Sequence, residues 1–180
     1  LGSGDCVNDN TAVGRYALKA FTGSGATAVG SGAADAATSA TNLTAVGKGA
    51  LGTCSEGANN TAVGTSSLAL LVGTGSSAGT GGNDNVALGY ASGYQTTGLR
   101  NILIGSEAGN FATTIDDCIA IGYRALKAAD SAGDNSDNAT GNYNVAVGNY
   151  TLDAITTGYA NIAIGYTALS AATNNIYNVA

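Results

Sequence analysis

The sequence predicts an all-β fold, a parallel β-solenoid made of short coils, and three observations lead to it. A five-residue motif, NTAVG at residues 10–14, returns unchanged at residues 60–64 and in close variants along the chain. The motif ends in glycine, and β-branched or aliphatic residues recur at fixed distances before it. The spacing between motifs is nearly constant. Periodicity of this kind is typical of solenoids and arrays, in which each coil packs on its neighbours.

Nine motif glycines define the repeat, and their intervals are 16, 17, 17, 25, 16, 17, 26 and 17 residues: Gly14, Gly30, Gly47, Gly64, Gly89, Gly105, Gly122, Gly148 and Gly165. The two long intervals are rich in Gly, Ser, Asp and Asn, so we expect loop insertions near residues 70–84 and 130–142. Each glycine is expected at a corner with positive φ, or where Cβ would not fit. Since parallel strands lie about 4.8 Å apart, nine coils predict a rod about 45 Å long. We interpret residues 1–180 as one repetitive segment of a longer chain.

Each motif predicts a short strand with two different faces. The residue three positions before the glycine is always Thr, Val or Ile, and the residue directly before it is Val, Leu or Ile. Alternate residues of a strand share a face, so we expect these two positions to point into the coil. The residue between them is alanine in eight motifs and Leu103 in the ninth, which predicts an outer face that packs closely against other chains. The subunit-packing candidates are Ala12, Ala28, Ala45, Ala62, Ala87, Ala120, Ala146 and Ala163.

Two further registers complete the predicted coil. Leucine stands four residues after the glycine in six coils, which favours a second short strand. Asparagine stands four residues before the glycine in six of nine coils, and stacked asparagines can form hydrogen-bonded ladders. Segments such as residues 15–21 contain good helix formers, but they are too short and too close to β-branched residues to favour a helix.

Composition excludes several classes of function. The chain has 6 basic and 12 acidic residues, a net charge of −6 and no histidine. The basic residues are scattered, which argues against nucleic acid as a partner. No apolar run is long enough to span a bilayer, so we expect no membrane insertion by this segment. Without histidine the chain lacks the commonest general base and metal ligand, and we expect no enzymatic activity and no cofactor.

The cysteines are expected to be buried free thiols. Cys6, Cys54 and Cys118 are an odd number and stand at different distances from their nearest motif glycines, so they do not stack into an internal disulfide framework. A disulfide between chains stays open as an alternative.

Acidic and aromatic residues provide the candidate binding sites. Asp130, Asp134 and Asp137, and separately Asp116 with Asp117, could hold calcium, but no EF-hand spacing is present and turns in solvated loops explain them better. Tyr90, Tyr123 and Tyr166 all follow the motif glycine directly, so they should line one outward stripe. These tyrosines are candidates for surface recognition of glycan or protein, and packing against a neighbouring coil or chain is the alternative.

The repeats resemble those of known fibres. NTAVGRYAL (residues 10–18), CIAIGYRAL (118–126) and TTGYANIAIGYTAL (156–169) are similar to the repeats of trimeric autotransporter adhesin heads and of bacteriophage and other viral tail fibres. The resemblance implies a left-handed parallel β-roll, three chains around one axis, and an extracellular fibre that touches a cell surface. The coils are longer than those of the adhesin heads, which favours a virion fibre.

Three functions follow from these patterns. The first is a structural and adhesive segment of a homotrimeric fibre on a virion or bacterial surface, which binds itself and a host glycan or protein. The second is the subunit of a self-assembling extracellular filament. The third is an ice-binding solenoid, since Thr11, Thr27, Thr44 and Thr61 share one register. Later coils carry Val or Ile at that position, from which we predict that the threonine register is interior and does not meet ice.

Overall fold

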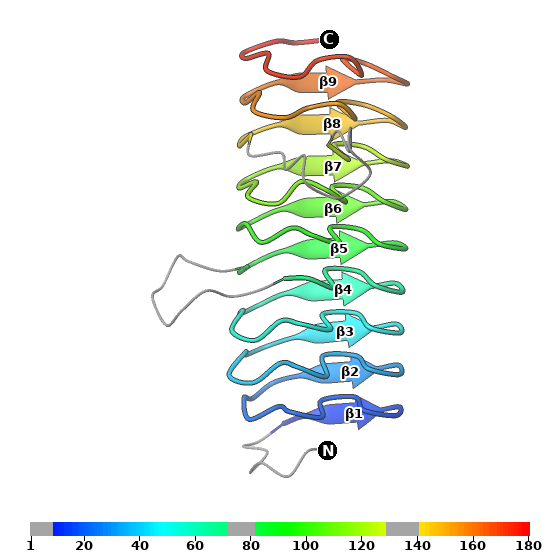
Figure 1. Ribbon diagram of the computed structural model, residues 1–180, viewed down its shortest axis with the longest axis vertical. Coiled ribbons are helices and arrows are strands. Elements are labelled where there is room, and N and C mark those ends of the chain that lie inside the picture. Colours follow the sequence, from blue (N-terminus) through cyan, green and yellow to red (C-terminus); the bar gives the residue numbers. More distant parts are fainter. Residues whose placement is uncertain (1–8, 72–81, 129–140) are drawn as a thin grey trace.

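The computed structural model describes residues 9–71, 82–128 and 141–180, which form a parallel β-solenoid (Figure 1). Each coil contributes one three-residue strand that coincides with the centre of one motif. The strands are β1 (Thr11–Val13), β2 (Thr27–Val29), β3 (Thr44–Val46), β4 (Thr61–Val63), β5 (Val86–Leu88), β6 (Ile102–Ile104), β7 (Ile119–Ile121), β8 (Val145–Val147) and β9 (Ile162–Ile164). The all-β solenoid predicted from the repeat is therefore confirmed.

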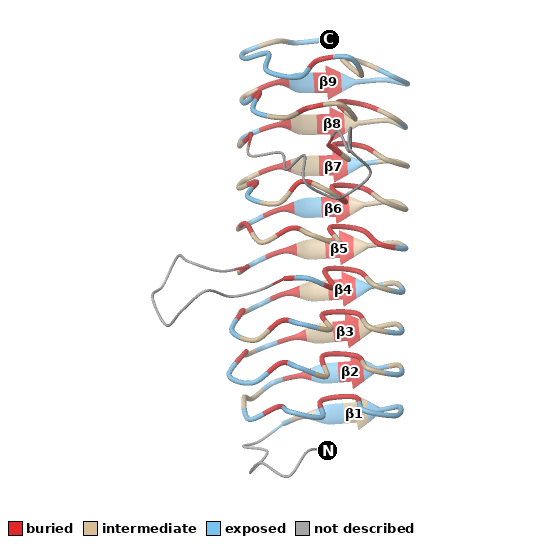
Figure 2. Cartoon of the chain, in the orientation of Figure 1, coloured by how far each residue is buried: buried red, intermediate tan, exposed pale blue. Residues whose placement is uncertain are grey.

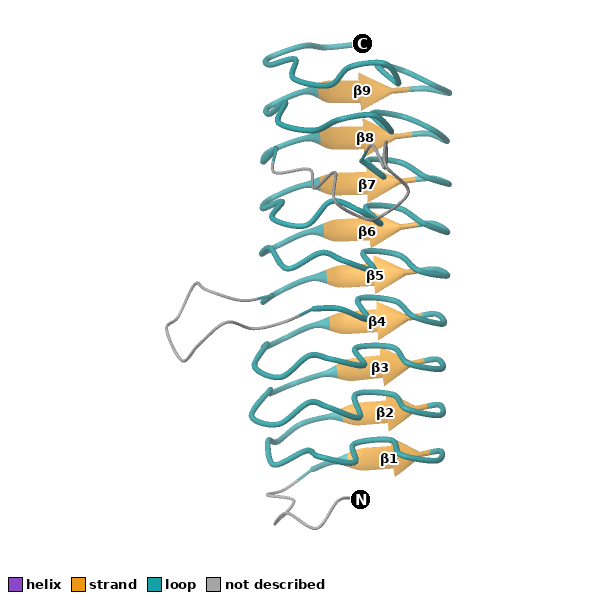
Figure 3. Ribbon diagram, in the orientation of Figure 1, coloured by secondary structure: helices purple, strands orange, loops and turns teal. Residues whose placement is uncertain are grey.

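The strands stack in sequence order into one sheet. Every neighbouring pair is parallel, and each motif position lies beside the same position of the next coil, as Thr11 lies beside Thr27. This register continues across the first long interval, where Thr61 pairs with Val86. The described ranges contain strands, turns and irregular segments but no helix (Figure 3), and accordingly no helix that could cross a membrane.

The motif glycines form the corner that follows each strand. Their φ angles lie between 128° and 138°, a region that residues with a Cβ rarely adopt. The corners also touch, because a Cβ built on Gly14 would lie 2.6 Å from the carbonyl oxygen of Gly30. Both reasons expected for glycine hold at the same position, so the repeat requires glycine here.

The two faces of the strands are the reverse of the prediction. The central residues of β2 to β9 are fully buried in the single chain: Ala28, Ala45, Ala62, Ala87, Leu103, Ala120, Ala146 and Ala163. Ala12 of the first coil is partly buried against the same core. The Thr, Val, Ile and Leu residues on either side of them point outward, and the burial colours alternate along each arrow in Figure 2. The prediction that the alanines pack against another chain is wrong.

The narrow interior of the coil explains this reversal. In the coil of β3, four other positions are buried together with Ala45: Leu43, Ala50, Leu51 and Cys54. These side chains fill the interior that the strand centre faces, so a larger residue there would overpack the core. The outer face has no such limit, and β-branched residues are well suited to it.

The second strand expected after each glycine does not form. That segment is a run of turns in which the residues two and four positions after the glycine have left-handed backbones, as in Tyr16 (φ 63°) and Leu18 (φ 52°). Hydrogen bonds hold it in place: the Ala17 N–H donates to Gly14 O (3.3 Å), and the Leu18 N–H donates to Ala33 O of the next coil (3.0 Å). Leucine at this position faces the core, and its side chain is fully buried in Leu18.

The predicted asparagine ladder is confirmed and lies inside the coil. Asn60, Asn85 and Asn101 are fully buried, and each side-chain oxygen accepts the backbone N–H of the next residue in the column at 3.0 Å. The amides of Asn85 and Asn101 also donate to the preceding asparagine oxygen, at 3.2 Å and 3.0 Å. The ladder stabilises the stack because it satisfies a backbone N–H at each step of the column from Asn60 to Asn178.

The described cysteines are free and buried, as expected. Cys54 packs among apolar side chains, whereas Cys118 occupies the asparagine column, where its sulfur accepts the Asn144 N–H at 3.4 Å. Burial raises the pKa of the Cys54 thiol to about 11 and that of Cys118 to about 12. Cys6 lies outside the described residues.

Candidate binding groove

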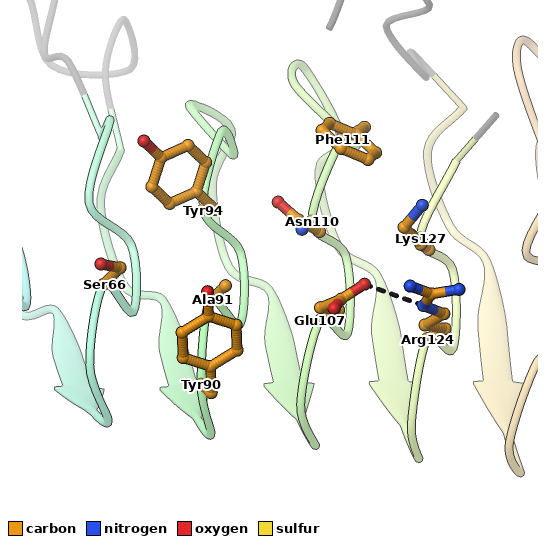
Figure 4. A pocket seen from close by; sticks show the side chains of 9 residues that line it. All are labelled: Ser66, Tyr90, Ala91, Tyr94, Glu107, Asn110, Phe111, Arg124 and Lys127. Atoms are coloured by element: carbon orange, nitrogen blue, oxygen red, sulfur yellow. Dashed lines mark hydrogen bonds and ion pairs between the residues drawn. The ribbon is translucent and has the colours of Figure 1, made fainter. Parts of the chain in front are cut away.

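Nine side chains from the turn segments of neighbouring coils line a groove beside β4 to β7. The groove encloses about 500 Å³, and its walls come from the turn segments after the motif glycines, not from the sheet face (Figure 4). Nine residues line it: Ser66, Tyr90, Ala91, Tyr94, Glu107, Asn110, Phe111, Arg124 and Lys127. Pockets that bind small molecules commonly have volumes of about 300–1,000 Å³.

Left-handed residues position the side chains along the groove. Ser66, Ala91, Glu107 and Arg124 stand two positions after successive motif glycines and have φ between 50° and 58°. Such a backbone costs about 1–2 kcal/mol for a residue with a Cβ. Hydrogen bonds between coils offset that cost, for example from the Glu107 N–H to Tyr90 O at 2.8 Å. The solenoid thereby places equivalent side chains side by side in neighbouring coils.

An ion pair joins two coils in the groove. Arg124 Nε donates to Glu107 Oε2 at 2.8 Å, and this hydrogen bond raises the pKa of Arg124. Within the described residues, Nε makes the only hydrogen bond of this guanidinium to another side chain, so its terminal amino groups keep their donors for a ligand. Lys127 Nζ lies 4.6 Å from the centre of the Phe111 ring, at cation–π distance.

Asn110 brings an unpaired polar atom to the groove. Its side chain is 8% exposed, and its Oδ1 has no hydrogen-bond partner among the described residues. An unsatisfied buried oxygen of this kind is rare in folded proteins and costs about 1–3 kcal/mol.

Of the tyrosines predicted for surface recognition, only Tyr90 lies in the groove. Its ring is 59% exposed. Tyr123 and Tyr166 lie farther along the solenoid, joined through Tyr150 by edge-to-face contacts with ring centres 5.2 and 6.2 Å apart. Tyr166 is 74% exposed and also borders a second, shallower hollow. The three predicted tyrosines therefore share a register but not one site.

Tyr94, Asn110 and Phe111 were missed by the sequence analysis. They stand five or six residues after their motif glycines, where other coils carry unrelated residue types. The signal lies across coils instead of within one motif: an aromatic residue, an amide and a second aromatic residue stand at neighbouring positions of consecutive coils. Knowledge that the coils stack in register is needed to recognise it.

The candidate calcium ligands form no metal site within the described residues. Asp130, Asp134 and Asp137 lie outside the described residues. Asp117 binds the Arg100 guanidinium at 2.6 and 2.7 Å, which lowers the pKa of that carboxyl, and Asp116 Oδ1 accepts the Leu99 N–H at 2.8 Å. Residues 9–71, 82–128 and 141–180 contain no group of three acidic, histidine or cysteine residues placed to hold a metal ion.

Comparison with models of protein families, with curated proteins and with solved structures found no match to this chain. The fold and the groove are therefore the basis on which a function is proposed.

Proposed function

We propose that this chain is a non-enzymatic structural and adhesive segment of an extracellular fibre, in which three copies pack through the outer face of the sheet. The observation that carries this proposal is the outward row of aliphatic residues along all nine strands. Val29, Val63 and Ile121 are 37–38% exposed, although they lie within the stack and have neighbours on both sides. A contiguous exposed apolar patch of this kind often marks a contact with another protein.

The strand face alone is a small interface. Nine strands at about 4.8 Å spacing, each about 10 Å long, give a face of about 400 Å² per chain. Two such faces would bury about 800 Å² together, which is below the roughly 1,000 Å² that a specific interface needs, so we expect residues bordering the strands to add to the contact. The number of three copies comes from the resemblance of the repeats to trimeric fibres, in which each chain would contribute the same strip to a common axis.

The rod shape supports a role in spacing and display. One strand per coil, parallel register and an internal asparagine ladder give a stiff solenoid whose turn segments are repeated at fixed distances. The resemblance of the repeats to viral tail fibres adds a left-handed roll, a virion surface and a host glycan or protein as partner. A bacterial trimeric adhesin head and a self-assembling extracellular filament are the alternatives.

Ice binding is the second candidate function, because the threonine register is not interior as predicted. Thr11, Thr27, Thr44 and Thr61 were predicted to be interior, but they point outward from β1 to β4, and Thr11 and Thr27 are exposed. Flat threonine rows on a solenoid are the arrangement that such a function needs. The continuation of the face as Val and Ile favours protein packing, and thermal hysteresis measured at millimolar protein would reverse that preference.

Light scattering coupled to size-exclusion chromatography tests the assembly. We expect three chains per particle, and we expect the double variant Val63→Lys, Ile121→Lys to run as a folded monomer because both side chains point away from their own core. Tyr143→Lys is the matched control, since Tyr143 is 60% exposed but lies outside the strands. It should remain trimeric.

Two results would overturn this proposal. A wild-type chain that is monomeric at tens of micromolar would contradict the proposed interface between copies. A particle whose mass grows with concentration would instead support the filament. Circular dichroism of each variant separates loss of assembly from loss of folding.

A further inference from the structure

We propose that the groove beside β4 to β7 binds a neutral oligosaccharide. This inference deepens the adhesive function proposed above by assigning it a site and a class of ligand. It depends on the combination of aromatic rings, hydrogen-bonding groups and low net charge that three coils bring together.

The aromatic rings provide surfaces on which sugar rings can stack. Tyr90, Tyr94 and Phe111 all border the same hollow of about 500 Å³, and Figure 4 shows Asn110 and Glu107 between them. The faces of aromatic rings carry partial negative charge and attract the weakly positive C–H groups of a pyranose. The half-exposed ring of Tyr90 makes little contact with its own chain, so a ligand would gain most of that surface.

The polar groups of the groove suit hydroxyl groups. A hydroxyl donates one hydrogen bond and accepts others, so its site must offer both kinds of partner. The carboxylate of Glu107 is an acceptor, whereas the terminal amino groups of Arg124 are donors. The Glu107–Arg124 pair fixes both side chains and leaves the outer atoms of each for the ligand, an arrangement that lowers the entropic cost of binding.

One of the two cations in the groove is neutralised. Arg124 is paired with Glu107 at 2.8 Å. The other cation, Lys127, has its Nζ 4.6 Å from the centre of the Phe111 ring. The lining residues therefore carry one net positive charge, and this single cation lacks the second basic group with which a site would hold a carboxylate or sulfate in a bidentate way. These observations favour a neutral sugar over an acidic one.

The proposed trimer would leave the groove open. Its residues belong to the turn segments after the motif glycines, whereas the proposed subunit contact uses the outward residues of the strands. A fibre of three chains would therefore present three copies of the groove, and several weak sugar contacts can combine into firm attachment.

An array of immobilised oligosaccharides, both neutral and carrying sialic acid or sulfate, tests this proposal with the full chain. We expect binding to neutral members, and titration calorimetry with the best of them should show that Tyr90→Ala weakens binding about tenfold or more, the effect of losing one stacking contact. Tyr166→Ala is the matched control, because this tyrosine has the same register and is also exposed but lies outside the groove. It should bind as the wild type does.

Three outcomes would overturn the inference: no neutral member bound at millimolar sugar, binding confined to acidic members, or equal loss in both tyrosine variants. Light scattering on the same samples keeps the two proposals apart. A trimer that binds no sugar refutes the sugar site and is consistent with the fibre proposal. A monomer that binds neutral sugar through Tyr90 refutes the trimer and supports the groove.

Discussion

Replacing Asn101 with alanine tests whether the internal asparagine ladder holds the coils together. The Asn101 side chain makes three hydrogen bonds: it accepts from the Cys118 N–H at 3.0 Å and donates to Asn85 Oδ1 at 3.0 Å and to Ile115 O at 2.7 Å. At about 1 kcal/mol each, their loss costs about 3 kcal/mol. The Cys118 N–H and the Ile115 carbonyl would also be left without these partners in the core, which brings the expected cost to about 3–5 kcal/mol.

Urea denaturation followed by circular dichroism measures this cost, and Asn149→Ala is its control. Asn149 also bonds the preceding coil, through an Oδ1 that accepts the Tyr123 N–H at 2.9 Å, but it is exposed, so water can replace the bond. We expect a change below about 1 kcal/mol in the free energy of unfolding for this variant. If both variants lose the same stability, burial of the ladder is not what makes it important, and the reasoning fails.

Two further predictions concern the motif glycine and the thiols. Gly89→Ala should cost about 2 kcal/mol more than Gly165→Ala, since both have φ near 130° but only Gly89 has a carbonyl oxygen 2.6 Å from the new Cβ; equal melting temperatures would refute this. In a Cys6→Ser background, Cys54 and Cys118 should react with a thiol reagent at pH 8 only after unfolding. Folding raises the pKa of Cys54 from 9.0 to about 11 and that of Cys118 from 9.0 to about 12. Burial of the two neutral thiols therefore stabilises the fold fully below pH 9.0, and this contribution is lost as the pH rises toward 12. Melting temperatures unchanged between pH 8 and 11 would contradict this prediction.

The strands and corners of this fold could be predicted because they repeat. The glycine spacing locates every described coil, and the asparagine register predicted the hydrogen-bonded ladder. The place of the ladder inside the coil and the position of Cys118 in it came only from the structure. Stacking in register multiplies any local preference by the number of coils, so even a weak signal becomes readable in the sequence.

The assignment of the strand faces could not be made from polarity, because both faces are apolar. Hydrophobic alternation identifies the buried side only where the other side is polar. The volume of the coil decides instead: where leucines such as Leu51 and Leu68 fill the interior, only a small residue fits at the strand centre. The second strand was predicted from leucines that face this interior through left-handed turns, a backbone that their residue type does not reveal.

The groove could not be predicted for a different reason. Its residues belong to separate coils and do not recur, so no single motif contains the site. The register of the coils brings them together, and only the choice of residue at equivalent positions makes this part of the surface different from the rest.

One departure from the motif does indicate which face of the strand is interior. Leu103 replaces the usual alanine at the centre of β6, and the adjacent turn positions, where most coils carry leucine, are Gly93 and Gly109. A Cβ on Gly93 would lie 2.7 Å from Leu103 Cδ1, and one on Gly109 would lie 2.8 Å from its Cδ2. The large and small residues have exchanged places within one core volume, which is expected only if all three positions share the interior.

A double-mutant cycle makes this exchange measurable. Leu103→Ala should cost about 2–5 kcal/mol through the cavity it leaves, and Gly109→Leu alone about 1–3 kcal/mol through overpacking. The double variant should be more stable than the sum of the two by at least about 2 kcal/mol, because it restores the arrangement of the other coils, in which leucine already adopts φ of 47° to 52°. Additive losses in urea denaturation would mean that the two residues do not share a volume, and that another cause placed alanine inside the coil.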